Sequence, residues 1–102
     1  MINLGANLHT AAVRLHILHH AAQHEIHGAW IAAELARHGH DIGAGTLYPL
    51  LHRMEAADLL TSRQDTADGR RRRHYQATEQ GRAVLADCRA ALAELADELL
   101  GG

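Results

Sequence analysis

The stretch GAGTLYPLLHRMEAADLLTSRQ (residues 43–64), followed after a short turn by GRRRRHYQAT (residues 69–78), decides the fold of this chain. Four apolar side chains in its first half recur at spacings i, i+3, i+4 and i+7: Leu47, Leu50, Leu51 and Met54. This spacing predicts a helix with one buried face. Pro49 fits a helix that begins near Thr46, because the N–H that proline lacks has no helical partner in a first turn.

Two strand-like segments follow this predicted helix. The first covers residues 59–63 and the second covers residues 73–77, with Asp68-Gly69 as a hairpin turn signal between them. Four consecutive arginines, Arg70–Arg73, are expected at the tip of the hairpin. The order helix, strand, basic hairpin, strand is typical of a winged helix-turn-helix, in which a helix and a hairpin both contact DNA.

Further helices complete the expected fold, which is mostly α with a small β-hairpin (α+β). Apolar residues at spacings of three and four predict helices over residues 8–22 and 29–37, the second ended by Gly39. Thr78 is expected to cap a last helix that runs to about residue 100. We expect one compact unit, with a winged-helix DNA-binding domain over residues 1–80 and a C-terminal dimerisation helix over residues 81–102.

Composition narrows the class of protein. The 102 residues suit one domain, and 47% of them are apolar, which favours a folded chain. Only one Trp and two Tyr contribute aromatic surface, so the light core favours dimerisation. The single cysteine excludes an intrachain disulfide. We see no signal peptide or membrane-length apolar stretch, and expect a cytoplasmic protein with no membrane partner.

The predicted helix shows a different chemistry opposite its leucines. That face carries Thr46, Tyr48, Pro49, His52 and Arg53, whose polar members can bind phosphates or base edges. An isolated basic run is about as often a solvated loop as a binding site. Here the order of elements favours contact with double-stranded operator DNA, and the candidate hairpin contacts are Arg70, Arg71, Arg72 and Arg73.

Three stretches carry a family resemblance: GTLYPLLHRME (residues 45–55), LL (residues 59–60) and RHYQATEQG (residues 73–81). They resemble the PadR family of bacterial transcriptional regulators, as does His27-Gly28 before the second helix. The resemblance implies a winged-helix protein that dimerises through its C-terminal helix and usually represses transcription. It places Thr46, Tyr48, Pro49 and Arg53 in the recognition helix and the four arginines in the wing. Two positions depart from the family pattern, Ala29 replacing a common aromatic residue and Asp58 replacing the usual glycine.

The last predicted helix carries a heptad seam. Its members, spaced by four and three residues, are Gly81, Leu85, Cys88, Leu92, Leu95 and Leu99. The same residues can pack against the chain's own first helix, and both arrangements can hold together. We expect a homodimer in which Leu85, Cys88, Leu92, Leu95 and Leu99 meet the partner's last and first helices. Cys88 is interpreted as a small buried hydrophobe.

The ten histidines form a separate feature that the resemblance does not explain. Imidazoles at i, i+4 can share one metal ion, and the pairs His16/His20 and His20/His24 have that spacing. The candidate metal ligands are His9, His16, His20, His24 and His27. Imidazole binds zinc, nickel, cobalt and copper, so the spacing does not choose among them. The alternatives are a merely polar helix face or a pH-sensing cluster.

These observations lead to competing functions. The first is a homodimeric repressor released from its operator by an effector, either a transition metal held by the N-terminal histidines or a small apolar molecule between the subunits. The second is a winged-helix protein-interaction module without DNA binding. An enzyme is disfavoured, because the sequence offers no serine–histidine–acid set, phosphate-binding glycine loop or acid pair.

Overall fold

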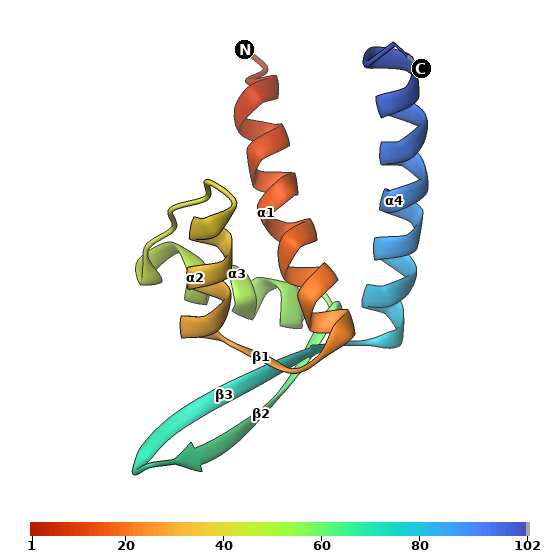
Figure 1. The fold of residues 1–102 in the computed structure, drawn as a ribbon. Coiled ribbons are helices and arrows are strands. Elements are labelled where there is room, and N and C mark those ends of the chain that lie inside the picture. Colours follow the sequence, from red (N-terminus) through yellow and green to blue (C-terminus); the bar gives the residue numbers. More distant parts are fainter. Residues whose placement is uncertain (102) are drawn as a thin grey trace.

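The computed structural model describes residues 1–101, apart from the side chain of Ala67. Mostly helical with a small antiparallel sheet, it confirms the expected α+β winged-helix architecture (Figure 1). In chain order the elements are α1 (Leu4–Gln23), β1 (Ile26–His27), α2 (Gly28–Arg37), α3 (Ala44–Ala56), β2 (Leu60–Ala67), β3 (Arg70–Ala77) and α4 (Glu79–Leu99).

The elements are arranged along an elongated molecule of 52 × 27 × 25 Å. Figure 1 shows α1 and α4 running antiparallel, with both chain termini at one end of the molecule. Helices α2 and α3 lie beside α1, and the β2–β3 hairpin projects at the end opposite the termini. None of the described helices is long and apolar enough to cross a membrane.

The core is built from one face of each helix and the base of the sheet. On α3 the four periodic residues Leu47, Leu50, Leu51 and Met54 are all buried, as predicted. On α1 the buried residues are Val13, Ile17, Leu18 and Ala21. Of the apolar stripe that the spacing predicts on this helix (Leu8, Ala11, Leu15, Leu18 and Ala22), only Leu18 is fully buried. Leu15 and Ala22 are partly buried against the core, and Leu8 is 65% exposed. Two apolar stripes share this helix, and only one faces the core.

The wing is longer than the sequence predicted. Asp68 and Gly69 have φ values of 53° and 74°, and this pair of left-handed residues closes a tight hairpin turn. Pairing extends up to that turn, from Leu60 opposite Ala77 to Ala67 opposite Arg70. The four arginines therefore belong to strand β3 and do not form a loop at the tip, because the backbone ladder continues through them. Strand β1, which the sequence did not predict, adds to β3 with Ile26 opposite Tyr75.

Helix α4 is joined closely to the base of the wing. Thr78 donates its N–H to the carbonyl oxygen of Leu59 (3.1 Å), and its side-chain oxygen accepts the N–H of Gly81 (2.9 Å). Gly81 is buried, and a Cβ atom there would collide with the Leu59 carbonyl oxygen. Asp58, which precedes this junction, has a φ of 63°, a left-handed conformation that Asp tolerates better than most residues. Asp can thus occupy a turn conformation for which the family resemblance implies glycine.

We predict that Gly81→Ala destabilises the protein by about 1–3 kcal/mol, because the added methyl group overpacks against backbone that cannot rotate away. Gly45→Ala is the matched control, since nothing lies within 4 Å of the Cβ position at this helical glycine. That change should stabilise by about 0.4–1 kcal/mol. Urea unfolding of both variants measures the difference, and equal stabilities would contradict the tight junction.

Candidate nucleic-acid interface

The outward face of α3 is the face that the sequence assigned to DNA. Burial of the leucine row turns the remaining side chains to solvent, and five of these are exposed: Thr46, Tyr48, Pro49, His52 and Arg53. Gly28, at the start of α2, has no side chain, and a Cβ there would lie 2.5 Å from the ring of Tyr48. The ring thus rests against the N-terminus of α2 and remains 44% exposed.

A hollow of about 410 Å³ brings the recognition-helix residues and the wing together. Its lining comes from the start of α2, from α3 and from the two wing strands. These residues include Tyr48, His52, Gln64, Arg70, Arg71, Arg72 and Arg73. The structure thus places two of the predicted α3 residues beside all four arginines, although these groups are separated by about twenty positions in the sequence.

Arg53 lies apart from this hollow. It borders a second one of about 240 Å³, together with Arg14 of α1 and apolar residues of α3 and the following loop. Sequence reasoning missed Arg14, because a single arginine on an amphipathic helix gives no local signal. The structure therefore offers cations on two sides of α3, with the wing on one side and Arg14 with Arg53 on the other.

The arginines of the wing differ in whether a carboxylate pairs with them. Arg63 of β2 is held by Glu25, with its Nε and Nη2 donating to the two carboxylate oxygens at 2.8 and 2.7 Å. This contact lowers the pKa of Glu25 and joins β2 to the residue before β1. Within residues 1–101, by contrast, Arg70–Arg73 form no ion pair, and all four are exposed. Their positive charge remains available to an anionic partner.

His27 has a structural role at the edge of the hollow. Its Nδ1 accepts the N–H of Trp30 at 3.4 Å and thereby caps α2. Burial, followed by the nearby charges of Arg72 and His74, holds the pKa of His27 below its ordinary value. The neutral ring is the form that can accept this hydrogen bond. The histidine ring next to it is that of His74, with the centroids 6.0 Å apart.

The histidines of α1 meet partners that the sequence analysis did not propose. His9 and His16 lie beside His40, with ring centroids 4.7 and 5.2 Å from it, and His16 lies 4.8 Å from His38. Burial first, and neighbouring imidazoles next, lower the pKa of His16. His24, by contrast, packs against Trp30 at 5.0 Å. In the described part of the chain, no three His, Cys, Asp or Glu residues already have their donor atoms placed around one metal position.

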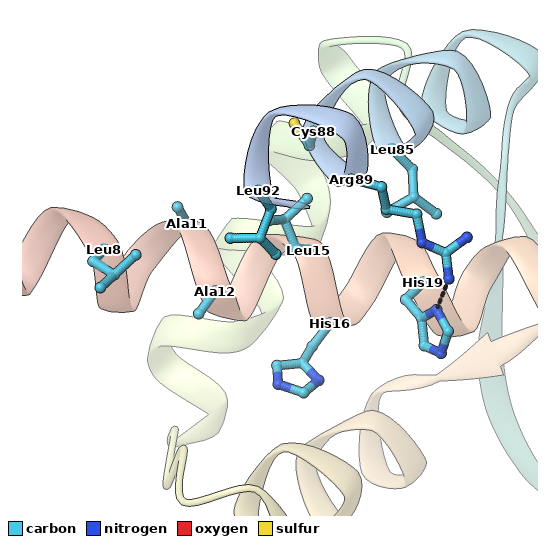
Figure 2. A pocket seen from close by; sticks show the side chains of 10 residues that line it. All are labelled: Leu8, Ala11, Ala12, Leu15, His16, His19, Leu85, Cys88, Arg89 and Leu92. Atoms are coloured by element: carbon cyan, nitrogen blue, oxygen red, sulfur yellow. Dashed lines mark hydrogen bonds between the residues drawn. The ribbon is translucent and has the colours of Figure 1, made fainter. Parts of the chain in front are cut away.

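The seam of α4 divides into a buried and an exposed part. Leu85 is buried, Cys88 is half-buried, and Leu92, Leu95 and Leu99 are 52%, 46% and 69% exposed. Between α4 and α1 lies a mostly apolar pocket of about 320 Å³ (Figure 2). Its lining is Leu8, Ala11, Ala12, Leu15, His16, His19, Leu85, Cys88, Arg89 and Leu92. The second apolar stripe of α1 thus faces this pocket.

Comparison with known proteins shows which family has this combination of recognition helix, wing and C-terminal helix. The model of the PadR-like family of transcriptional regulators matches residues 17–87, most of the chain. The chain belongs to this PadR-like family. Its members regulate transcription and are not enzymes, so this PadR-like protein is a transcriptional regulator.

Individual relatives agree with this assignment. Transcriptional regulator Rv3488 of Mycobacterium tuberculosis is 63% identical over 92 residues, which cover 90% of this chain and 86% of that protein. A PadR family regulator from Eggerthella lenta is 30% identical, with a TM-score of 0.81 over 94% of this chain and 85% of that one. A PadR-like factor from Bacteroides fragilis shares the fold, with a TM-score of 0.83 at 24% identity over 98% of both chains.

The capping role of His27 in this PadR-like protein predicts an acid-sensitive contribution to stability. Because the folded state disfavours the charged ring, this contribution is complete above the ordinary pKa of 6.5 and is lost as pH falls through the lowered folded pKa. Asn caps a helix without titrating. His27→Asn should therefore lose less thermal stability than the unmodified protein between about pH 7.5 and about pH 5.5.

The measurement is the melting temperature from circular dichroism at both pH values. His27→Ala serves as the control, because it removes the cap at either pH. It should cost about 0.5–2 kcal/mol relative to the unmodified protein at about pH 7.5, and less at about pH 5.5, where the unmodified protein has itself lost the cap. An unchanged pH-dependent loss in His27→Asn would show that the cap does not titrate.

Proposed function

We propose that this PadR-like regulator is a homodimeric repressor that binds a two-fold operator and is released by an effector. The observation that carries the proposal is the shared hollow, where Tyr48 and His52 of α3 face the arginines of β3. A helix can enter the major groove, and unpaired guanidinium groups beside it can hold the flanking phosphates. Such a protein acts on DNA in the cytoplasm.

The wing arginines and the exposed side chains of α3 divide the recognition task. Arginines in an exposed strand reach phosphates or the minor groove and contribute mainly affinity, which salt weakens. His52 and Arg53 on α3 can hydrogen-bond to base edges and contribute sequence choice. Arg14 stands beside Arg53 and is suited to a phosphate on the other side of the groove. The overall charge of −2 does not oppose this, because binding depends on where the cations lie.

Dimerisation is supported by the apolar surface that a single chain leaves exposed. Leu92, Leu95, Leu99 and Leu100 of the C-terminal segment and Leu4 and Leu8 of α1 are at least 46% exposed. These residues lie in the N-terminal part of α1 and the C-terminal part of α4 and beyond it. Figure 1 shows those parts at the end of the molecule opposite the wing. A two-fold partner packed there leaves both recognition helices outward, where they can read half-sites about one DNA turn apart.

For DNA binding, we predict that the double change Arg71→Ala/Arg73→Ala weakens affinity for the DNA upstream of the protein's own gene. It should lower the slope of log Kd against log salt by about 2, since each lost phosphate contact removes about 0.9. Fluorescence anisotropy at several salt concentrations measures this. The change Arg37→Ala also removes a positive charge, from α2, and should leave the slope unchanged. If the unmodified protein shows a slope near zero, the interaction-module alternative replaces this proposal.

For the dimer, we predict that Leu92→Glu/Leu95→Glu yields a monomer, because two carboxylates in an apolar seam would have to lose their hydration. Light scattering coupled to size-exclusion chromatography measures the mass. Ala90→Glu is the control, since Ala90 is exposed on α4 about 200° from Cys88 around the helix. A dimer that survives the leucine changes would place the interface elsewhere.

A small apolar molecule is a second candidate for the effector. The pocket between α1 and α4 supports it, because leucines and alanines line most of its wall and the proposed dimer interface adjoins it (Figure 2). A ligand held there would contact both helices that the proposed dimer uses. It would regulate only if it favoured one spacing of the two recognition helices over another.

A further inference from the structure

Two histidines that follow α2 meet the histidines of α1. His38 caps the C-terminal end of α2 and His40 lies in the segment that leads to α3, so both belong to the connection before the recognition helix. His9, His16 and His20 lie on α1, the helix proposed to adjoin the dimer partner. These five histidines, called the histidine cluster below, thus lie where α1 meets the connection that leads to α3.

A carboxylate engages one part of this cluster. Oε1 of Glu34 lies 3.3 Å from Nε2 of His38 and 3.9 Å from Nε2 of His20. These two histidines therefore have an anionic partner within the fold. His9, His16 and His40 form the other part, in which, among the described residues, no ring nitrogen lies within 4 Å of a carboxylate oxygen. The ring of His16 joins the two parts, since it lies 5.2 Å from His40 and 4.8 Å from His38.

The spacing in this second part suits a shared metal ion. The Nδ1 atoms of His9 and His40 are 3.2 Å apart. Two imidazole nitrogens bound to one metal at about 2.1 Å lie about 3.0 Å apart in octahedral geometry and about 3.4 Å apart in tetrahedral geometry. The observed separation falls between these values. Without a metal, the same two atoms can form one hydrogen bond, in which one ring must donate its proton to the other.

We propose that His9, His16 and His40 bind one first-row divalent transition metal ion, which ties α1 to the segment before α3. Imidazole nitrogen selects Zn²⁺, Ni²⁺, Co²⁺ or Cu²⁺ over Mg²⁺, which requires oxygen ligands. His9 is exposed and the ring of His16 is only partly covered, so small rotations can bring the third nitrogen to the ion. Water can fill the remaining positions.

The position of the site gives the ion a regulatory role, and this part of the inference depends on the proposed function. The segment from Gly39 to Gly43 separates α2 from α3 and contains no helix or strand. A metal that fixes His40 to α1 limits how far α3 can move relative to the dimer helices. Since one spacing of the two recognition helices fits the operator, the ion changes DNA affinity by favouring or opposing that spacing.

The binding test uses the full chain without a purification tag, stripped of metal with a chelator. Calorimetric titration with ZnCl₂ and NiCl₂ should give one strong site per chain, and MgCl₂ should give none. The variant His9→Gln/His40→Gln should bind more than about 100-fold more weakly, since losing even a group that orients a ligand costs about 10–100-fold. The control His19→Gln/His24→Gln removes the same number of histidines from the protein and should bind as the unmodified protein does.

A second measurement needs no variant. In NMR spectra of the unmodified protein, paramagnetic Co²⁺ should shift or broaden the ring signals of His9, His16 and His40 before those of His24, His27 and His52. Equal affinity in the two double variants, or first effects at His24 and His27, would overturn the assignment of the site.

The regulatory part is tested by operator binding with and without the bound ion. We expect the ion to change the Kd for DNA at least tenfold in the unmodified protein and in the His19/His24 control, and not in the His9/His40 variant. Metal binding with an unchanged DNA Kd would overturn the regulatory role and leave the site intact. Absence of DNA binding in either state would instead overturn the proposed function, while the calorimetric result would still stand.

Discussion

Burial of the leucine row on α3 is the constraint on which the rest of the molecule depends. Leu47 and Leu51 are 1% and 0% exposed, so the rotation of this helix about its axis is fixed by the core. That rotation turns Tyr48 and His52 towards the wing and Arg53 towards α1. The hydrophobic effect thereby orients the face that we propose to read DNA, although the buried residues are not themselves part of that face.

Hydrogen bonds at the base of the wing hold β3 in a fixed position relative to α3. Ser62 of β2 donates to both carboxylate oxygens of Glu55 on α3, at 2.9 and 2.8 Å, and accepts a hydrogen bond from Arg73 at 3.0 Å. Tyr75, two residues further along β3, is 1% exposed and anchors the strand in the core. The arginines therefore extend from a fixed strand, which would limit the backbone entropy lost in the proposed binding to phosphates.

The sequence predicted what is local and missed what depends on distant contacts. The buried face of α3, the Asp68-Gly69 turn and the Thr78 cap follow from spacings of a few residues, and the structure confirms them. Strand β1 is two residues long and exists because β3 pairs with it, so no local pattern predicts it. His38 and His40 were not among the candidate ligands, because their proximity to His9 and His16 arises only when α2 folds against α1. Among the candidate ligands, His27 instead caps α2, whereas the rings of His16 and His20, and those of His20 and His24, remain neighbours with centroids 6.5 Å apart.

Helix α1 contributes residues to both candidate effector sites, the apolar pocket and the proposed metal site, because its faces contact different parts of the molecule. Val13, Ile17 and Ala21 pack in the core, Leu8 and Leu15 border the apolar pocket with α4, and His9 lies beside His40 in the segment before α3. His16 lies between these last two faces, because it lines the pocket and also neighbours His40. A ligand in the pocket acts on the side of α1 that faces α4, whereas a metal acts on the side that faces α3. Both would change the same quantity, the position of α3 relative to the dimer helices. Two chemically unrelated effectors could therefore regulate the same operator contact through one helix. Their binding would be coupled, because each effector favours one position of α1, and that position changes the affinity for the other effector.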